Sequence, residues 1–387
     1  MRILISGWRS YVALELIRLL QSHEVYVVDS QSKYISQKSN YIKKCFTSSK
    51  PVWCFKGFKN DILKIIKDYN IDVLIPTSEE IFYLSFFKEE IEASNCKFLW
   101  EDFTTLRELH SKYDIISKCQ WMGITIPETV KFYSKKKLES YIASKSIKNY
   151  VIKPEFSRFA SQVVSNKFWR KTIRDINIDL KYNSYICQEY IDGLDVSSYS
   201  IFNKWDLGSH VSYISQNSYK NGASIAFKTY KNKNILDFLI QFWKTTWFHG
   251  QIAFDFKVNN KDVVLLECNP RATNGIHLFR EDKNFKETLE KILIQEHIKT
   301  SYVLSRQVER VHIIPLVLYI FMSWKLSLLW KIYRLNSDTV YDKNNRYIFW
   351  YQLYLFLFYI KKSFLSRKSI TEAMTYDIEY DGQTLIK

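Results

Sequence analysis

The start of the chain alternates between apolar runs of two different periods, and this pattern constrains the fold more than any other feature. "RILISGW" is a short apolar run that ends at Gly7, "VALELIRLL" follows with helical spacing, and "EVYVVDS" is a second β-rich run. Strand, turn, helix and strand in this order predict an α/β unit built on a parallel sheet. With 387 residues, 47% of them hydrophobic, the chain is long enough for two or three domains.

The carboxyl ends of these predicted strands carry few signals of a cofactor. "GWRSYVALE" holds one glycine where a dinucleotide site needs three, and Asp29 is weak evidence alone, so we expect no nicotinamide cofactor there. A further buried run, "IDVLIPTSEE", ends in Glu79 and Glu80. Ligands of open α/β sheets bind at the carboxyl ends of strands, which makes these two acids candidates for a substrate-facing edge. Acids also favour helix N-termini, and the two interpretations are compatible.

Three later segments predict antiparallel strands instead. "YVIKPEFSRFASQVV" (150–164) and "SYICQEYIDGLDVSSYSIF" (184–202) each indicate strand, connector and strand. "GQIAFDFKVNNKDVVLLECNPR" (250–271) indicates a hairpin with its turn near residues 259–262. Lysines and acids stand at the ends of these strands. Two antiparallel layers with such ends favour a nucleotide clamp over a continued parallel sheet.

The end of the predicted hairpin carries candidate metal ligands. Side chains alternate along a strand, so Glu267 and Asn269 point one way and Cys268 points the other. Carboxylate and amide oxygens suit Mg²⁺, which usually keeps water and substrate phosphates as further ligands. Asp255 lies opposite Glu267 if the hairpin loop holds three residues, and faces the other surface if it holds two. Ordinary strand-end acids paired with lysine or arginine are the alternative.

Two cationic side chains also stand at the ends of predicted strands. Arg271 lies beyond the strand end, where its planar guanidinium could hold a carboxylate or a phosphate. Lys153, in "YVIKPEF", is held at a strand end by Pro154 and can reach a nucleotide phosphate. A single lysine of this kind is more often a solvated surface residue. The connector "CQEYIDG" is typical of segments that offer backbone groups to an adenine edge.

Taken together, these segments resemble an ATP-grasp enzyme. The matching order is "LHSKYDIISKCQWMGITIPET", "VIKPEFSRFASQVV", "QEYIDGLDVSSYSI" and "FDFKVNNKDVVLLECNPRATNGIHLF". The chain is similar to bacterial ATP-grasp proteins that resemble the carbamoyl-phosphate synthase large subunit, and the similarity extends through "SITEAMTYDIEYDG". "ECNPR" in this order with the upstream lysines is specific, whereas each piece alone is not.

The resemblance implies an α/β protein with the α+β ATP-grasp fold. It divides the chain into three parts. Residues 1–104 would form a Rossmann-like pre-ATP-grasp domain. Residues 105–300 would form two α+β subdomains that clamp ATP, with 113–183 as the small lid subdomain. Residues 301–387 would form an aromatic-rich, helical C-terminal region.

The resemblance also implies which residues bind the nucleotide. They are two phosphate-holding lysines, the connector around the adenine and an acid near the ribose: Lys112, Lys153, Gln188, Glu189, Ile191 and Asp195. Many ATP-grasp enzymes cover the phosphates with a glycine-rich loop, but here that loop is "EFSRFASQ" and has no glycine. Ser157, Arg158 and Ser161 are candidate substitutes, Arg158 through its charge. This departure leaves an ATP-binding sensor or scaffold without turnover as the alternative to an enzyme.

The implied chemistry is the activation of a carboxylate by ATP. Asp255, Glu267 and Asn269 match the ligands of Mg²⁺ or Mn²⁺. A small-molecule carboxylate would attack the γ-phosphate, and an amine or a thiol would then attack the acyl phosphate, with ADP and phosphate released. Lys153, Arg158 and Arg271, which matches the arginine that faces the acyl phosphate, would be the catalytic residues.

The substrate pocket is expected between the acidic edge of the first sheet and the segment that follows the hairpin. Its candidate residues are Glu79, Glu80, Arg271, Asn274 and His277. A hydrogen-bonded structural role for His277 is an equally good interpretation. These residues specify neither the carboxylate nor the amine, and the sequence gives no oligomeric state.

Composition excludes one class of partner and bears on location. The net charge of +16 comes from scattered lysines without a nucleic-acid-binding motif, so we expect no nucleic acid partner. Six cysteines without paired spacing indicate reduced thiols and a cytoplasmic protein. The apolar runs at 313–324 and 347–360 fall short of the ~20 residues of a spanning helix. We expect them to form a helical cap; peripheral docking at a membrane is the less favoured alternative.

Overall fold

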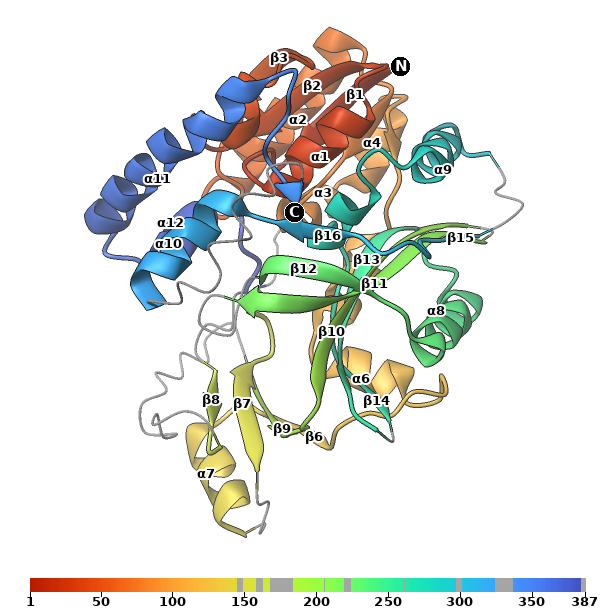
Figure 1. Cartoon of the computed structure of the whole chain (residues 1–387), viewed down its shortest axis with the longest axis vertical. Helices are drawn as coiled ribbons and strands as arrows, with labels where there is room; N and C mark the ends of the chain where they lie inside the picture. Colours follow the sequence, from red (N-terminus) through yellow and green to blue (C-terminus); the bar gives the residue numbers. More distant parts are fainter. Residues whose placement is uncertain are drawn as a thin grey trace.

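The computed structural model of the chain describes residues 1–144, 149–157, 163–167, 184–204, 206–218, 224–260, 262–296, 301–323 and 337–383. In this described part the strands form a parallel sheet near the N-terminus and two largely antiparallel sheets (Figure 1). The structure therefore has the mixed α/β architecture that the alternation of apolar periods predicts.

The parallel sheet has the strand order β3-β2-β1-β4-β5. Its strands are β1 (Arg2–Ser6), β2 (Glu24–Asp29), β3 (Ile42–Thr47), β4 (Val73–Ile75) and β5 (Lys97–Phe98). The helices along this part of the chain are α1 (Tyr11–Leu19), η1 (Ile35–Lys38), α2 (Phe55–Tyr69), α3 (Glu80–Ser85), α4 (Lys88–Ala93), α5 (Phe103–His110) and α6 (Asp114–Cys119). The apolar residues of β1, β2 and β4 are buried, which is the pattern of strands covered on both faces.

A small antiparallel sheet with one covering helix follows. Its order is β6-β9-β7-β8, with β6 (Thr129–Phe132), β7 (Tyr150–Pro154), β8 (Val164–Ser165) and β9 (Tyr185–Glu189). Helix α7 (Lys135–Ser144) packs on it through Leu138, which is buried with Phe132, Ile152 and Cys187. This small sheet and α7 project from one end of the molecule (Figure 1).

The largest sheet occupies the middle of the molecule (Figure 1). Its path is β14-β13-β10-β11-β12-β16, with β10 (Leu194–Asn203), β11 (Asp206–Ser218), β12 (Ser224–Tyr230), β13 (Gly250–Val258), β14 (Val263–Asn269) and β16 (Glu309–Val311); β15 (Tyr302–Val303) pairs with β11. The helices of this part are α8 (Lys233–Thr246), η3 (Asn274–Phe279) and α9 (Lys283–Ile294). Phe238 and Phe242 of α8 pack edge-on against Phe254 of β13 and fill the core between helix and sheet.

The C-terminal region contains more than the helices expected from its apolar runs. Two short strands, β15 and β16, extend the central sheet before α10 (Ile313–Ser323), α11 (Arg346–Ser366) and α12 (Ile370–Thr375). Helix α11 lies against the first α/β unit, where Tyr351 and Leu355 are buried with Leu14 of α1 and Ile35 of η1. Among the described residues, no helix is long and apolar enough to cross a membrane.

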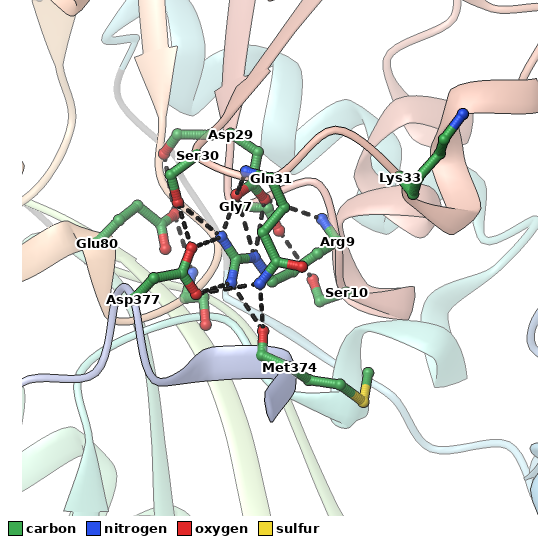
Figure 2. A network of polar contacts seen from close by, with 12 residues as sticks. Gly7, Arg9, Ser10, Asp29, Ser30, Gln31, Lys33, Glu80, Met374 and Asp377 are labelled. Atoms are coloured by element: carbon green, nitrogen blue, oxygen red, sulfur yellow. Dashed lines mark hydrogen bonds and ion pairs between the residues drawn. The ribbon is translucent and has the colours of Figure 1, made fainter. Parts of the chain in front are cut away.

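The end of the chain returns to the carboxyl edge of the parallel sheet (Figure 2). Arg9, in the turn after β1, forms a buried ion pair with Asp29 and donates from Nη1 to Asp377 Oδ1 at 2.7 Å. Ser30 Oγ also donates to Asp377, at 2.6 Å. Burial opposes ionisation of Asp377, but Arg9 lowers its pKa to about 2. Asp29 therefore lies in an ion-pair network that fastens the C-terminal region to the first turn.

Candidate nucleotide and metal site

The acid pair of the hairpin lies at the centre of the candidate site. Asp255 on β13 faces Glu267 on β14, and Ala253 faces Asn269 two positions further along. The two strands begin to face each other at Val258 and Val263, and a register shift between Asp255 and Phe256 then brings the acids opposite each other. A three-residue loop would have placed Asp255 opposite Glu267 directly. The connection is longer than that, and the bulge restores the same pairing.

The two carboxylates perturb each other and their neighbours. Burial, followed by the charge of Glu267, raises the pKa of Asp255 to about 7. Burial would raise the pKa of Glu267 too, but Lys112 and Lys153 outweigh it and hold that pKa below its ordinary value. Two close, partly buried carboxylates repel each other, and a bound cation relieves that repulsion.

Hydrogen bonds hold the acids and the amide in place. Ser197 Oγ on β10 donates to Asp255 Oδ1 at 2.6 Å, and Asn269 Nδ2 donates to Asp255 Oδ2 at 3.2 Å. Asn269 Oδ1 accepts from Arg271 Nη2 at 3.1 Å. The sequence analysis missed Ser197, because a serine on an alternating strand carries no signal of its own.

Two lysines approach this acid pair from outside the hairpin. Lys153, at the end of β7, places its Nζ 3.7 Å from Glu267 Oε2, and burial lowers its pKa although Glu267 opposes this. Lys112, at the start of the segment after α5, donates to the backbone oxygens of Glu155 at 3.3 Å and Ser157 at 3.1 Å. The structure thus brings together both lysines that the resemblance assigns to the ATP phosphates.

Glu155 contacts several residues around Lys112 and Lys153. It was not singled out from the sequence. Its buried carboxylate accepts hydrogen bonds from Ser111 and Ser184 and forms an ion pair with Lys131 at 2.7 Å. Its backbone oxygen also accepts from the backbone N–H of Lys112, at 3.4 Å. Glu155 follows Pro154 directly in "IKPEF", and an acid next to the phosphate lysine was the available signal.

The small sheet has one apolar face and one polar face. Residues in register alternate between them, so Lys131, Lys153 and Ile186 share the face opposite α7. Gln188 stands on the same face and donates from Nε2 to Thr129 Oγ1 at 3.1 Å. The face that carries Lys153, which the resemblance assigns to the phosphates, therefore also carries Gln188, which it assigns to the adenine region.

The other residues assigned to the nucleotide lie further along the same path. Glu189 ends β9 with its backbone N–H donating to Glu128 O at 2.8 Å, and Ile191 follows in the connector to β10. Asp195 is an exposed residue at the start of β10, where it pairs with Lys257 at 2.7 Å. Arg158 lies outside the described residues.

Glu79 joins the parallel sheet to the candidate site. Its buried carboxylate accepts the backbone N–H of Tyr380 at 3.0 Å and lies 3.9 Å from Arg271 Nε and 4.0 Å from His110 Nε2. Arg271 thus stands between Asn269 of the acid cluster and Glu79 of the first α/β unit. An acid and an arginine meet at the sheet edge where the sequence predicts substrate contacts.

Glu80 faces the first turn instead. One of its carboxylate oxygens, Oε1, accepts from Ser6 Oγ at 2.9 Å and from the backbone N–H groups of Thr77 and Ser78. A Cβ built on Gly7 would lie 2.5 Å from that oxygen. Figure 2 shows Gly7 and Glu80 beside the Arg9 network. Glu80 opens α3 as well, which is the helix-terminus role given as the compatible alternative.

His277 and Asn274 belong to η3, after the hairpin. His277 is fully buried, and its Nδ1 lies 2.8 Å from Glu15 Oε2 of α1. Burial lowers the pKa of His277 to about 4, although Glu15 opposes this. Arg280 binds the same carboxylate, with Nε 3.0 Å from Oε1. The structure therefore places His277 in an ion-pair network between η3 and α1; Asn274 is the half-buried first residue of η3.

The donor set fits a hard divalent cation. Asp255, Glu267 and Asn269 offer carboxylate and amide oxygens from two adjacent strands. Burial and then the charge of Glu267 raise the pKa of Asp255, and a cation would balance that charge. Few protein ligands and adjacent lysines for phosphate oxygens are the usual surroundings of Mg²⁺. The alternative of strand-end acids paired with cations describes Glu267 and Lys153. It does not describe Asp255, which accepts hydrogen bonds from Ser197 and Asn269.

Comparison with known proteins identifies the fold around this site. The family model of the ATP-grasp domain matches residues 109–275, which include Lys112, Lys153, the acid pair and Arg271. The chain therefore carries an ATP-grasp domain over these residues. No curated protein sequence matches the chain significantly.

Solved structures share the architecture at low sequence identity. N5-carboxyaminoimidazole synthetase from Staphylococcus aureus has a TM-score of 0.63 at 10% identity, over 84% of this chain and 86% of that one. L-Amino acid ligase from Bacillus licheniformis has a TM-score of 0.60 at 14% identity, over 81% and 79%. The biotin carboxylase domain of Hydrogenobacter thermophilus 2-oxoglutarate carboxylase, solved with MgADP and bicarbonate, has a TM-score of 0.60 at 10% identity, over 78% and 71%. These likenesses confirm the predicted ATP-grasp fold.

Proposed function

We propose that the protein is an ATP- and Mg²⁺-dependent ligase that activates a small carboxylate as an acyl phosphate and joins it to an amine or a thiol. The observation that carries the proposal is the meeting of Lys153, the Asp255–Glu267 pair and Arg271 in one place. The ATP-grasp domain match over residues 109–275 and structural neighbours named as ligases and carboxylases support it.

In this proposal the nucleotide lies on the polar face of the small sheet. Gln188, Glu189 and Ile191 border the adenine, Asp195 lies towards the ribose, and Lys112 and Lys153 hold the phosphates. Asp255, Glu267 and Asn269 would hold Mg²⁺ or Mn²⁺, which supplies charge neutralisation at the phosphates when it is bound. The buried surroundings of these lysines strengthen their interaction with a phosphate, because little water competes.

The reaction follows from the charges around Arg271. A substrate carboxylate that pairs with Arg271 is held beside Lys153, and its oxygen attacks the γ-phosphorus while the bond to the β-phosphate oxygen breaks and ADP leaves. Lys153 and Arg271 stabilise the negative charge as it moves onto these oxygens. The nucleophilic amine then attacks the acyl carbon, phosphate leaves, and the amine proton passes to solvent. Glu79 is suited to hold the amine by a hydrogen bond beside the carboxylate that pairs with Arg271, and Asn274 would complete the substrate contacts.

Release of ADP tests turnover and separates the ligase from the binding-only alternative. The protein is incubated with Mg-ATP, a panel of amino acids and other small carboxylates, and an amine donor. We expect ADP to form only when both partners are present. Nucleotide binding without ADP release from any pair would favour the sensor or scaffold. A cytoplasmic location, where thiols stay reduced, is part of the proposal, and the six unpaired cysteines agree with it.

A further inference from the structure

Helix α11 has an apolar face that the described part of the chain leaves exposed. Large side chains at helical spacing are exposed along it: Tyr347, Trp350, Leu353, Leu357, Ile360 and Phe364. Trp350 is 62% exposed, Leu357 65% and Phe364 84%. The opposite face of the same helix packs on Leu14 and Ile35 of the first α/β unit. The exposed side chains therefore form one stripe along α11. The helix itself lies at the outer edge of the molecule (Figure 1).

The charged side chains of residues 343–368, which include α11, all have one sign. Residues 343–368 contain six Lys or Arg residues and no Asp or Glu. Lys343 and Arg346 lie at one end of α11, and Lys361, Arg367 and Lys368 lie at the other, all exposed. Apolar side chains with lysine and arginine at the ends match the apolar interior and anionic headgroups of a lipid surface.

We propose that α11 docks the protein on the surface of a membrane that contains anionic lipids. The helix would lie in the plane of the surface, with the stripe from Tyr347 to Phe364 in the headgroup region and the basic ends beside lipid phosphates. A helix of 21 residues is about 30 Å long, and its exposed side chains follow that whole length, so it meets a flat surface along its side. Aromatic residues such as Trp350 are favoured at this depth.

A bilayer fits the face better than a second copy of the chain. A symmetric dimer through α11 would bring the basic ends of two copies together, and residues 343–368 offer no acidic side chain to balance them. Anionic headgroups supply the missing charge. An apolar stripe of this extent on a helix surface marks an interaction site of some kind, because single scattered apolar residues are the norm on free surfaces.

Vesicle flotation of the full chain tests the proposal. We expect the protein to float with vesicles of phosphatidylcholine and phosphatidylglycerol in equal amounts, and far less with phosphatidylcholine alone. The double substitution Trp350→Glu and Leu357→Glu should lower binding at least about tenfold, because it removes two apolar side chains from the contact. Replacement of Lys361 by Gln should lower binding to the anionic vesicles roughly fivefold.

A matched control and a fold check make the outcome decisive. Trp121 is also exposed, at 85%, but lies after α6, so Trp121→Glu should float as the unchanged protein does. Melting temperature and stabilisation by Mg-ATP should be the same in all variants, since α11 is outside the nucleotide site. Absence of flotation, or flotation that survives the double substitution, would overturn the proposal. So would a dimer in solution that the double substitution dissociates, which would assign the face to a second copy.

Discussion

Glu267 and Cys268 are neighbours on β14 but face different surroundings. Glu267 is partly exposed and lies 3.7 Å from Lys153, whereas Cys268 is buried and its pKa is raised far above the ordinary value by burial. Glu267→Gln keeps the size of the side chain but removes a charge from the proposed metal site. We expect ADP formation to fall by on the order of a hundredfold or more, and nucleotide affinity only modestly.

Cys268→Ser is the matched substitution on the other face of the strand. We expect it to leave ADP formation nearly unchanged and to lower the melting temperature, because it puts a hydroxyl into an apolar place. Steady-state rates and thermal melts of the two variants separate these effects. Loss of activity in Cys268→Ser but not in Glu267→Gln would contradict the proposed metal site.

The pKa of Asp255 gives a pH dependence with a definite sign. Burial and Glu267 raise this pKa to about 7, so the carboxyl holds a proton below that pH and loses it above. A divalent cation competes with this proton, and its affinity should therefore increase as pH rises through about 7. Titration of Mn²⁺ or Mg²⁺ by calorimetry at pH values on either side measures this.

The same shift affects the stability of the metal-free protein. Because the folded-state pKa is raised, the folded state keeps the proton longer than the unfolded state, and stability falls as pH rises from the unfolded pKa towards about 7. Asp255→Asn should remove this dependence and stabilise the metal-free protein above that range. Asp195→Asn, an exposed acid on β10, is the control and should change neither property.

At the scale of elements, the turn between β1 and α1 depends on Gly7. Its φ of +67° is favoured for glycine, and an added Cβ would meet the Glu80 carboxylate at 2.5 Å. Gly7→Ala should therefore cost about 2–4 kcal/mol in the free energy of unfolding. Gly123 has a similar φ of +71° but open space around it, so Gly123→Ala should cost only about 1 kcal/mol. Denaturant unfolding compares the two, and equal losses would contradict the contact with Glu80.

The strands also show which parts of the fold can be predicted from the periodicity of apolar residues in the sequence. Strands β1 and β2 and the hairpin strands β13 and β14 were predictable because they are apolar or alternating runs of five to nine residues. The pairing of Asp255 with Glu267 was left open, since a bulge near Phe256 sets the register and no residue type announces it. Strands β15 and β16 span two and three residues, too short to produce a period, and only their pairing with the central sheet defines them.

At the scale of the whole molecule, residues distant in sequence complete both the fold and the site. Sequence motifs located Lys153, Glu267 and Arg271, because the family resemblance carries them at fixed positions. The approach of Glu79 to Arg271 and the return of Tyr380 to Glu79 are tertiary contacts, and local patterns could not give them. For the same reason the sequence could not decide whether His277 binds substrate or has a structural role. Its contact with Glu15 is also a tertiary contact.

The ion-pair network of Arg9, Asp29 and Asp377 should determine part of the protein's stability towards acid. The pKa of Asp377 is lowered to about 2 by Arg9, against the opposing effect of burial, so its contribution is present above the unfolded pKa and lost as pH falls towards 2. Asp377→Ala should cost about 3–5 kcal/mol at neutral pH, because Arg9 stays buried with one partner fewer. Thermal melts of the unchanged protein and of Asp377→Ala across this pH range measure the effect. The same dependence of melting temperature on pH in both proteins would contradict the stabilising role of the network.

Binding of ATP with and without Mg²⁺ tests the central claim, the ATP-grasp site, most directly. Calorimetric titration and melting of the full chain should show weak binding of ATP alone and a clear rise in melting temperature with saturating Mg-ATP. Lys153→Ala should reduce that rise, because it removes the buried positive charge that we propose holds the phosphates. No shift in melting temperature with Mg-ATP at saturation, or a full shift in Lys153→Ala, would contradict the account.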